Sequence, residues 1–381
     1  MRQTLGQSLS GPDARNNAFD SIRLFAASAV IISHSFALTS GSDLTEPLFR
    51  LTRGQATIGL SAVGIFFIVS GLLISMSFDR SKTAARFALN RALRLFPGLW
   101  VCVLLTVFVL GPVLTMLPLS DYVSDKQTWG FLGALVFWPF SSGMGGMFPD
   151  NPYPHAVNGS LWTLKYEVVF YIGGAILLLT GRWRRALVLL AWGVSMVATI
   201  LLRDPHQHSG LLYHVAQLLW LFRFYGAGML CYLYRDRVPL HTGFGWLAAF
   251  GVVVAMATPL FAEALALGGA YTVLILAFHA PRWFKRLTRR GDMSYGVYIY
   301  AFPIQQALVP FSLSFRSPAF ANIALSFPLI LLLAWLSWRL VEAPALRFKQ
   351  GSKGTQKGLA RFPATSPEVP PSTRFSDQSK S

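Results

Sequence analysis

Ten long apolar segments constrain the fold of this chain more than any other feature of its sequence. Each holds about 17 to 25 predominantly apolar residues, the length that a helix needs to cross about 30 Å of hydrocarbon. A composition with 53% hydrophobic and 13% charged residues also indicates a membrane protein. We therefore expect an all-α polytopic integral membrane protein with about ten transmembrane helices. The segments are 19–38, 60–78, 92–117, 160–180, 186–202, 211–233, 242–258, 262–279, 294–311 and 320–341.

The basic residues predict how these segments are oriented, because cytoplasmic loops retain Lys and Arg. With a cytoplasmic N-terminus, 25 of the 33 Lys and Arg residues fall on the cytoplasmic side and five on the other. Ten spans then place the C-terminus in the cytoplasm as well. The net charge of +17 reflects this asymmetry and contact with anionic headgroups. A nucleic-acid partner is not expected, because no basic stripe lies on a soluble domain.

Three regions are expected along the chain. Residues 1–17 form a polar cytoplasmic arm, 18–348 form the membrane domain, and 349–381 form a Ser- and Pro-rich tail that we expect to be disordered. No removable signal peptide is expected at the N-terminus. A weaker apolar stretch, 128–140, is too short to span and favours a re-entrant or interfacial segment.

A histidine inside the first apolar segment is the strongest candidate for chemistry. His34 follows Arg23 by eleven residues, which is about 16 Å along a helix and more than halfway across the membrane from the inner face. An ionisable side chain in hydrocarbon is costly unless it is paired or functional. The other histidines, at 155, 206, 208, 214, 241 and 279, lie in loops or near interfaces and are left out of the site.

Glu167 is a second ionisable residue within an apolar segment, about two turns from the outer side. One interpretation makes it a structural partner for Arg223, which lies midway along its own segment. The other makes it the acceptor that orients His34, since a histidine backed by a carboxylate is the usual arrangement of a general base. The sequence leaves both interpretations open.

Two further motifs have both a structural and a functional interpretation. Arg91 and Arg94 share one helix face, where paired guanidinium groups suit phosphate oxygens, but topology alone also places basic residues there. The segment from Gly64 to Gly71 contains small residues that allow close helix packing, and Ser70 offers a hydroxyl near the site.

The loop 119–158 is expected on the outer side and is rich in aromatic residues, among them Trp129, Phe131, Trp138 and Phe140. These rings are typical of the aromatic belt at a membrane interface. They would equally suit the wall of an acceptor site, where they would stack on sugar rings. Cys102 and Cys231 lie within spans without a CxxC pattern, which favours packing over a disulfide or metal site.

In several short motifs the chain resembles the membrane acyltransferase 3 family, whose bacterial members O-acylate polysaccharides, lipopolysaccharides and Nod factors. The resemblance spans about residues 19–347. It rests on Arg23-x10-His34, Phe-Phe-x-x-Ser-Gly at 66–71, Arg91-x-x-Arg94 before Pro97, Ser160-Leu-Trp-Thr-Leu-Lys-Tyr-Glu167, Ser294-Tyr-Gly-Val-Tyr298, and Glu342-Ala-Pro344.

This resemblance implies an acyltransferase of the O-acetyltransferase type in the bacterial inner membrane. His34 would be catalytic and Glu167 a required acidic residue, while Arg91 and Arg94 would handle acyl-CoA, with acetyl as the commonest acyl group. We add Arg23 to the donor site. No cofactor is expected to be tightly bound, and the acceptor is expected to be a glycan or lipid-linked saccharide outside the cytoplasm.

Two departures from the family limit what can be carried over. Many relatives have a second histidine after the Tyr298 motif, where this chain has Tyr300-Ala-Phe302-Pro. Some relatives also carry a hydrolase-like domain after the membrane part, where this chain has a polar tail.

The mechanism stays open in three respects. Candidates for the substrate site and for stabilising the oxyanion are Ser70, Trp162, Tyr166 and Arg223. Direct transfer and a covalent acyl-enzyme are both compatible with the sequence. A proton-coupled transporter, in which His34, Glu167 and Arg223 form a relay, is the alternative function.

Overall fold

Helices dominate the computed structural model, which describes residues 3–11, 14, 16–137, 141–202, 207–289 and 291–348. Each of the ten predicted apolar segments is helical. They form α2 (Phe19–Ser40), α4 (Ile58–Arg80), α5 (Ala84–Leu105) continuing through η3 (Thr106–Leu110) into α6 (Gly111–Leu114), α9 (Trp162–Leu179), α10 (Arg184–Leu202), α11 (Gly210–Leu233), α12 (Thr242–Ala255), α13 (Phe261–Ala264) continuing through η8 (Leu265–Gly269) into α14 (Ala270–His279), α16 (Ser294–Ser312), and α17 (Pro318–Ser337) continuing into η9 (Trp338–Glu342).

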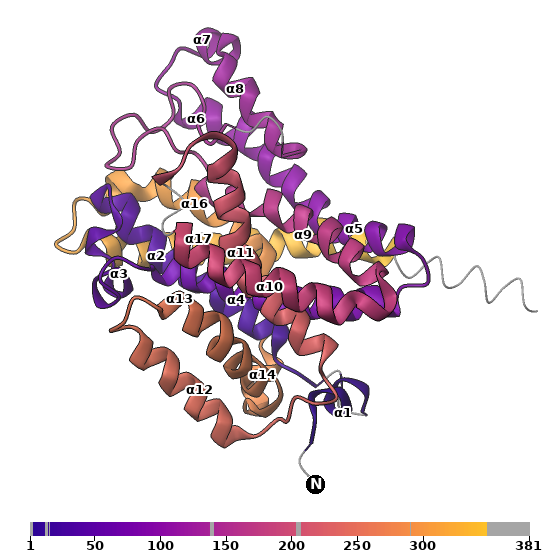
Figure 1. Ribbon diagram of the computed structural model, residues 1–381. Coiled ribbons are helices and arrows are strands. Elements are labelled where there is room, and N and C mark those ends of the chain that lie inside the picture. Colours follow the sequence, from indigo (N-terminus) through magenta and orange to yellow (C-terminus); the bar gives the residue numbers. More distant parts are fainter. Residues whose placement is uncertain are drawn as a thin grey trace, which may run out of the picture.

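Shorter helices connect these long ones (Figure 1). They are α1 (Leu5–Ser10), η2 (Asp43–Thr45), α3 (Pro47–Leu51), α7 (Leu119–Ser124), α8 (Lys126–Gly130), η4 (Phe131–Leu135), η5 (Gly159–Leu161), η6 (Gly181–Trp183) and α15 (Arg282–Arg286). The predicted weak stretch at 128–140 forms the end of α8 and then η4, while 138–140 lie outside the described residues.

Seven helical segments are long and apolar enough to cross a membrane: Phe19–Ser40, Ile58–Arg80, Ala84–Leu114, Gly159–Leu179, Gly181–Leu202, Phe261–His279 and Pro318–Phe348. The protein is therefore a multi-pass membrane protein that resides in a lipid bilayer. The helices α11, α12 and α16 match the other three predicted segments, so the count of ten spans and the location of the termini stay predictions.

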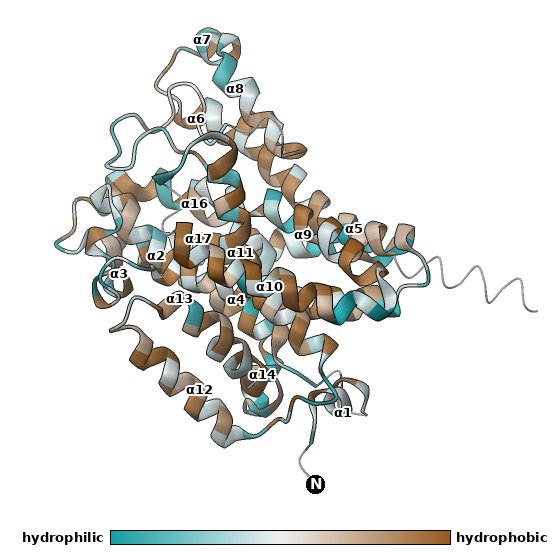
Figure 2. Cartoon of the chain, viewed as in Figure 1, coloured by the Kyte–Doolittle hydropathy of each residue, from teal (hydrophilic) through white to brown (hydrophobic). Residues whose placement is uncertain are grey.

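The outer surface of the bundle is apolar, as a lipid-facing surface requires. Large hydrophobic side chains lie exposed on α10 and α12, including Leu201 and Trp246 at 75% and 78% exposure. Figure 2 shows hydrophobic residues along the helices and hydrophilic ones mainly at helix ends and in loops. No hydrophobic force drives helices together inside lipid, so their association depends on close packing and internal polar contacts.

Close packing between α4 and α11 depends on glycine. A side chain at Gly71 would collide with the backbone carbonyl of Tyr225, and one at Gly228 would collide with the carbonyl of Ile68. The ring of Phe224 fills the space above Gly64. The packing interpretation of the 64–71 segment is therefore supported by the structure.

A buried polar cluster joins α2, α16 and α17. The amide of Gln305 donates to the Ser35 hydroxyl at 2.7 Å and to the Ile31 carbonyl at 2.8 Å. The Ser35 hydroxyl donates to the side-chain oxygen of Asn322, whose amide donates to the Gln305 carbonyl. Because Ser35 follows His34, this cluster fixes the part of α2 that carries the histidine.

The N-terminal arm is folded against the bundle rather than extended. Leu5 and Leu9 of α1 are buried, and the amides of Leu5 and Gly6 donate to the carbonyls of Val238 and Arg235. In Figure 1, α1 lies far from α3 and α7. The predicted tail, 349–381, lies outside the described residues.

Candidate active site

Three arginines from two helices converge on one cavity within the bundle. We call it the arginine cavity, and it lies between α2, α4, α5, α9 and the start of α16. The structure thus brings together the three arginines predicted for the donor, and it adds Ser70 and Glu167 to the same walls. The polar and aromatic lining comprises Arg23, Phe66, Phe67, Ser70, Arg91, Arg94, Thr163, Glu167, Tyr171, Ser294, Tyr295 and Tyr298.

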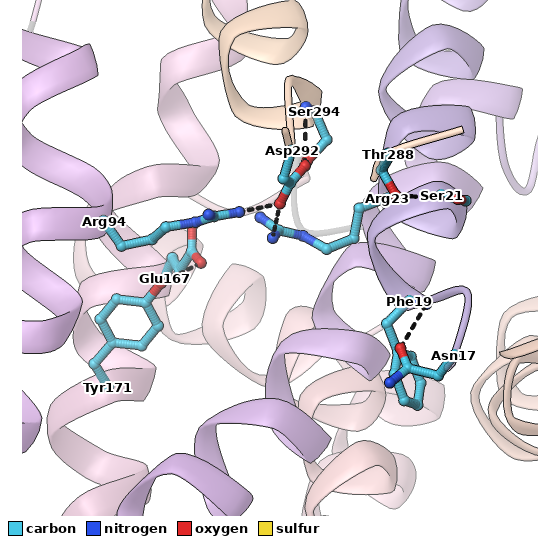
Figure 3. A network of polar contacts seen from close by, with 10 residues as sticks. All are labelled: Asn17, Phe19, Ser21, Arg23, Arg94, Glu167, Tyr171, Thr288, Asp292 and Ser294. Carbon is cyan, nitrogen blue, oxygen red and sulfur yellow. Dashed lines mark hydrogen bonds and ion pairs between the residues drawn. The ribbon is translucent and has the colours of Figure 1, made fainter. Parts of the chain in front are cut away.

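A carboxylate from the loop before α16 holds two of these arginines. Figure 3 shows Arg23 and Arg94 reaching Asp292 from opposite sides. Arg23 donates to Asp292 Oδ2 at 2.9 Å, Arg94 pairs with the same oxygen, and the Ser294 hydroxyl donates to Oδ1 at 2.5 Å. Burial alone would raise the pKa of Asp292, but the two guanidinium groups outweigh it and hold the pKa well below its usual value. Asp292 therefore stays ionised and fixes both cations.

Arg91 differs from its two neighbours because part of its guanidinium has no partner. Its Nε is buried and makes no hydrogen bond within the described part of the chain, while the Tyr171 ring lies 6.0 Å from Arg91 Cζ. A buried donor without a partner costs about 1 to 3 kcal/mol. Such a group, facing a cavity with two more arginines, suits a ligand that brings phosphate oxygens.

Glu167 lies in the arginine cavity, and the structure does not join it to His34. Its carboxylate accepts a hydrogen bond of 2.5 Å from the hydroxyl of Tyr171, one turn further along α9. The expectation that Glu167 orients His34 is therefore not met in this structure, because the i,i+4 tyrosine on its own helix face takes the carboxylate. The role of Glu167 in the reaction stays a prediction.

His34 lies beyond the cavity, against the ring of Phe302 at 5.1 Å between centroids. Its Nδ1 is buried, and the described residues provide no hydrogen-bond partner for it. The neighbouring Gln305 cluster holds this part of α2 in place, yet one nitrogen of the His34 ring makes no hydrogen bond to the described residues. Such a group can accept a proton from a substrate.

A pair of hydroxyls lies in the wall of the arginine cavity. The Thr163 and Tyr298 hydroxyls lie 2.7 Å apart, and the Phe66 ring packs on Tyr298 at 5.7 Å. Tyr298 lines the cavity, whereas Phe302 contacts His34 one helical turn further along α16. His34 is not among the described residues that line the cavity, and the two are linked through side chains one turn apart on α16.

Arg223 is separate from this site. It donates to Glu263 Oε1 at 2.6 Å, is 3% exposed, and lies 4.9 Å and 5.1 Å from the rings of Trp220 and Phe224. Its charge is paired with a carboxylate and lies against two aromatic faces, although its Nε has no hydrogen-bond partner among the described residues. The suggested pairing with Glu167 and the suggested oxyanion role are therefore not supported. The same pairing of Arg223 interrupts the relay of His34, Glu167 and Arg223 that the transporter interpretation requires.

Trp162 and Tyr166 also lie outside the arginine cavity. Their rings pack against each other at 5.9 Å, and the Tyr166 hydroxyl lies 3.3 Å from His214 Nδ1. Of the four residues suggested for the substrate, Ser70 is the one that lines the cavity.

Asp292 is the residue of this site that sequence reasoning missed. It lies two residues before Ser294, at the end of the bundle where the predicted topology places most basic residues. The signal was that it is the one acidic residue of the basic segment 281–292. His279 at the same end is exposed, and the described residues contain no group of three or more His, Cys, Asp or Glu that could hold a metal.

Comparison with known proteins identifies the family. Residues 16–339 match the acyltransferase 3 family model, described as an acyltransferase domain. The chain is 30% identical to the O-acetyl transferase of Shigella phage Sf6, over 86% of this chain and 95% of that protein. It is 28% identical to Nodulation protein 10 of Rhizobium leguminosarum bv. viciae, over 91% and 97%.

A shorter match links the chain to the exopolysaccharide production protein ExoZ of Rhizobium meliloti, with 31% identity over 35% of this chain and 38% of that protein. No solved structure matches. Because the family model covers most of the membrane bundle, including all three cavity arginines and His34, the chain belongs to the acyltransferase 3 family and is an acyltransferase.

Proposed function

We propose that this protein is a membrane O-acetyltransferase that takes an acetyl group from acetyl-CoA and transfers it to a hydroxyl of a glycan outside the cytoplasm. The observation that carries the proposal is that two buried nitrogens, Arg91 Nε and His34 Nδ1, have no hydrogen-bond partner among the described residues. Arg91 lines the arginine cavity, and His34 lies outside its lining against Phe302. One suits the phosphates of a donor, and the other suits a hydroxyl that must lose a proton.

The donor would bind in the arginine cavity. Arg23 and Arg94 are fixed by Asp292, and Arg91 remains available for phosphate oxygens. Guanidinium groups bind phosphate in a planar, charge-assisted geometry. With the predicted topology this cavity would face the cytoplasm, where acyl-CoA is made, and the family resemblance favours the bacterial inner membrane.

The acyl group would then pass the Thr163–Tyr298 contact to reach His34. His34 would accept the proton of the acceptor hydroxyl, whose oxygen attacks the thioester carbonyl. The carbon–sulfur bond breaks, the ester forms, and the imidazolium returns its proton to the departing CoA thiolate. This is direct transfer, with no covalent enzyme intermediate.

The glycan acceptor is supported by the names of the relatives. One is an O-acetyl transferase and one is an exopolysaccharide production protein. A surface polysaccharide or its lipid-linked precursor has the hydroxyl groups that such a reaction needs.

Mass spectrometry of the surface polysaccharide tests this function. A host that lacks the protein is complemented with the wild type, with His34→Ala, or with His279→Ala, which changes an exposed histidine at a helix end as a matched control. Wild type and His279→Ala should add acetyl groups, and His34→Ala should lower acetylation by about 100-fold or more.

Two results would contradict the proposal. Equal acetylation by His34→Ala at equal protein levels would remove His34 from the chemistry. A polysaccharide without added acyl groups in the wild-type strain would remove this glycan as the acceptor.

A further inference from the structure

A second cavity opens on the outside of the bundle, in the loop that follows α8. We call it the loop cleft, and its polar lining comprises Gln127, Ser141, Ser142, Tyr153 and His155, with Gly41 at its base. Its volume of about 540 Å³ falls within the range of small-molecule sites. We infer that the loop cleft binds a neutral sugar unit of the acceptor, an inference that rests on the proposed function.

The composition of the cleft points to a hydroxylated, uncharged ligand. The described residues that line it include no Asp, Glu, Lys or Arg. An amide and two serine hydroxyls offer donors and acceptors for sugar hydroxyls. The Tyr153 ring is 41% exposed, and an exposed aromatic face suits the apolar C–H face of a pyranose.

The walls of the cleft are held by buried contacts, so the site is formed in advance. The Gln306 amide of α16 donates to the carbonyls of Tyr153 and Ala156, both at 2.8 Å. Its side-chain oxygen accepts from the Asn151 amide at 2.8 Å. Preformed walls lower the ordering cost when a ligand binds.

The backbone near the cleft adopts conformations that non-glycine residues rarely take. His155 has a φ of 61°, and a side chain at Gly143 would collide with the His155 carbonyl. Gly41, with a φ of 79°, leaves room for the Pro152 carbonyl against the end of α2. Strained residues of this kind concentrate at binding sites.

A single aromatic ring, that of Phe302, lies between the loop cleft and His34. Phe302 lies 6.4 Å from the Tyr153 ring and 5.1 Å from the His34 ring, measured between centroids. Gly41 lies seven residues beyond His34, or about 10 Å along the axis of α2. A sugar in the loop cleft would therefore lie on the side of His34 that faces away from the arginine cavity.

Acceptor kinetics of the purified full chain in nanodiscs test the inference. The probe is a set of oligosaccharides released from the host polysaccharide and stripped of O-acetyl groups with mild base. Transfer rates are measured against oligosaccharide concentration and, separately, against acetyl-CoA concentration. Tyr153→Ala should raise the acceptor KM about tenfold and leave the acetyl-CoA KM within about twofold, and Gln127→Ala should raise the acceptor KM about threefold.

Two further variants separate the cleft from general effects. Tyr153→Phe keeps the ring and should retain an acceptor KM within about twofold of wild type. Trp246→Ala removes an exposed aromatic ring of α12, outside the cleft lining, and should not change the acceptor KM.

The outcomes distinguish this inference from the proposed function. Wild-type transfer with an unchanged acceptor KM in both Tyr153→Ala and Gln127→Ala would overturn the loop cleft alone. A wild type that transfers no acetyl group to any of the oligosaccharides would overturn the proposed function and the inference with it.

Discussion

The arginine cavity and the loop cleft lie on opposite sides of His34 and have opposite chemistry. The cavity lies between helices of the bundle and is lined by three arginines and Glu167, whereas the described lining of the cleft contains no Lys, Arg, Asp or Glu. The first suits a polyanion and the second a neutral polyol. The difference indicates that donor and acceptor approach His34 from separate ends, so each can be weakened without the other.

Among the changes that test whether donor and acceptor bind at separate sites, the largest effect is expected from the donor arginines. Arg91→Ala combined with Arg94→Ala should weaken acetyl-CoA binding about 100-fold, because two charge-assisted contacts worth about 1.5 to 3 kcal/mol each are lost. Oligosaccharide affinity should stay within twofold, measured by titration in nanodiscs. Lys82→Ala, an exposed change near the start of α5, is the control and should bind acetyl-CoA normally.

A smaller effect is expected from the carboxylate that positions two of the arginines. Asp292→Asn keeps the shape but removes the charge between Arg23 and Arg94, and should raise the acetyl-CoA KM about tenfold through lost positioning. Unchanged donor kinetics would mean that Asp292 acts in stability alone.

The pH dependence of stability provides a second test of the role of Asp292. Because the pKa of Asp292 is lowered, its contribution to stability is present above the usual carboxylate pKa of about 4 and is lost only as the pH falls below it. The change in unfolding temperature caused by Asp292→Asn should therefore be constant between pH 5 and 8.

The smallest kinetic effect is expected from a change in the buried Arg223–Glu263 ion pair, which lies outside the lining of both the arginine cavity and the loop cleft. Glu263→Gln leaves the Arg223 cation without its counter-charge and should cost about 3 kcal/mol of stability, seen as a lower unfolding temperature. Both KM values should stay within twofold. A rise in only one of the two KM values would contradict this prediction and would indicate that Arg223 belongs to a substrate site.

The fold could be predicted from the sequence because the length of an apolar run sets the length of a helix in a membrane. All ten predicted segments are helical, with boundaries shifted by up to eight residues, the largest shift being at the start of α5, predicted at 92 and found at Ala84. The grouping of Arg23, Arg91 and Arg94 also followed from topology, since all three lie at the same predicted end.

The pairing of polar side chains could not be predicted in the same way. The sequence offers Arg223 and His34 as partners for Glu167, whereas the structure pairs its carboxylate with Tyr171, at i+4 on the same helix. Arg223 pairs with Glu263, forty residues away and on another helix, a contact set by helix packing that no local pattern encodes.

The most direct test of two separate approaches to His34 is a crossed kinetic experiment on one preparation. Wild type, the Arg91→Ala/Arg94→Ala variant and Tyr153→Ala are each assayed for the KM of acetyl-CoA and the KM of de-O-acetylated host oligosaccharide. The account predicts that the arginine variant raises only the first and Tyr153→Ala only the second. Variants that raise both KM values equally would contradict it.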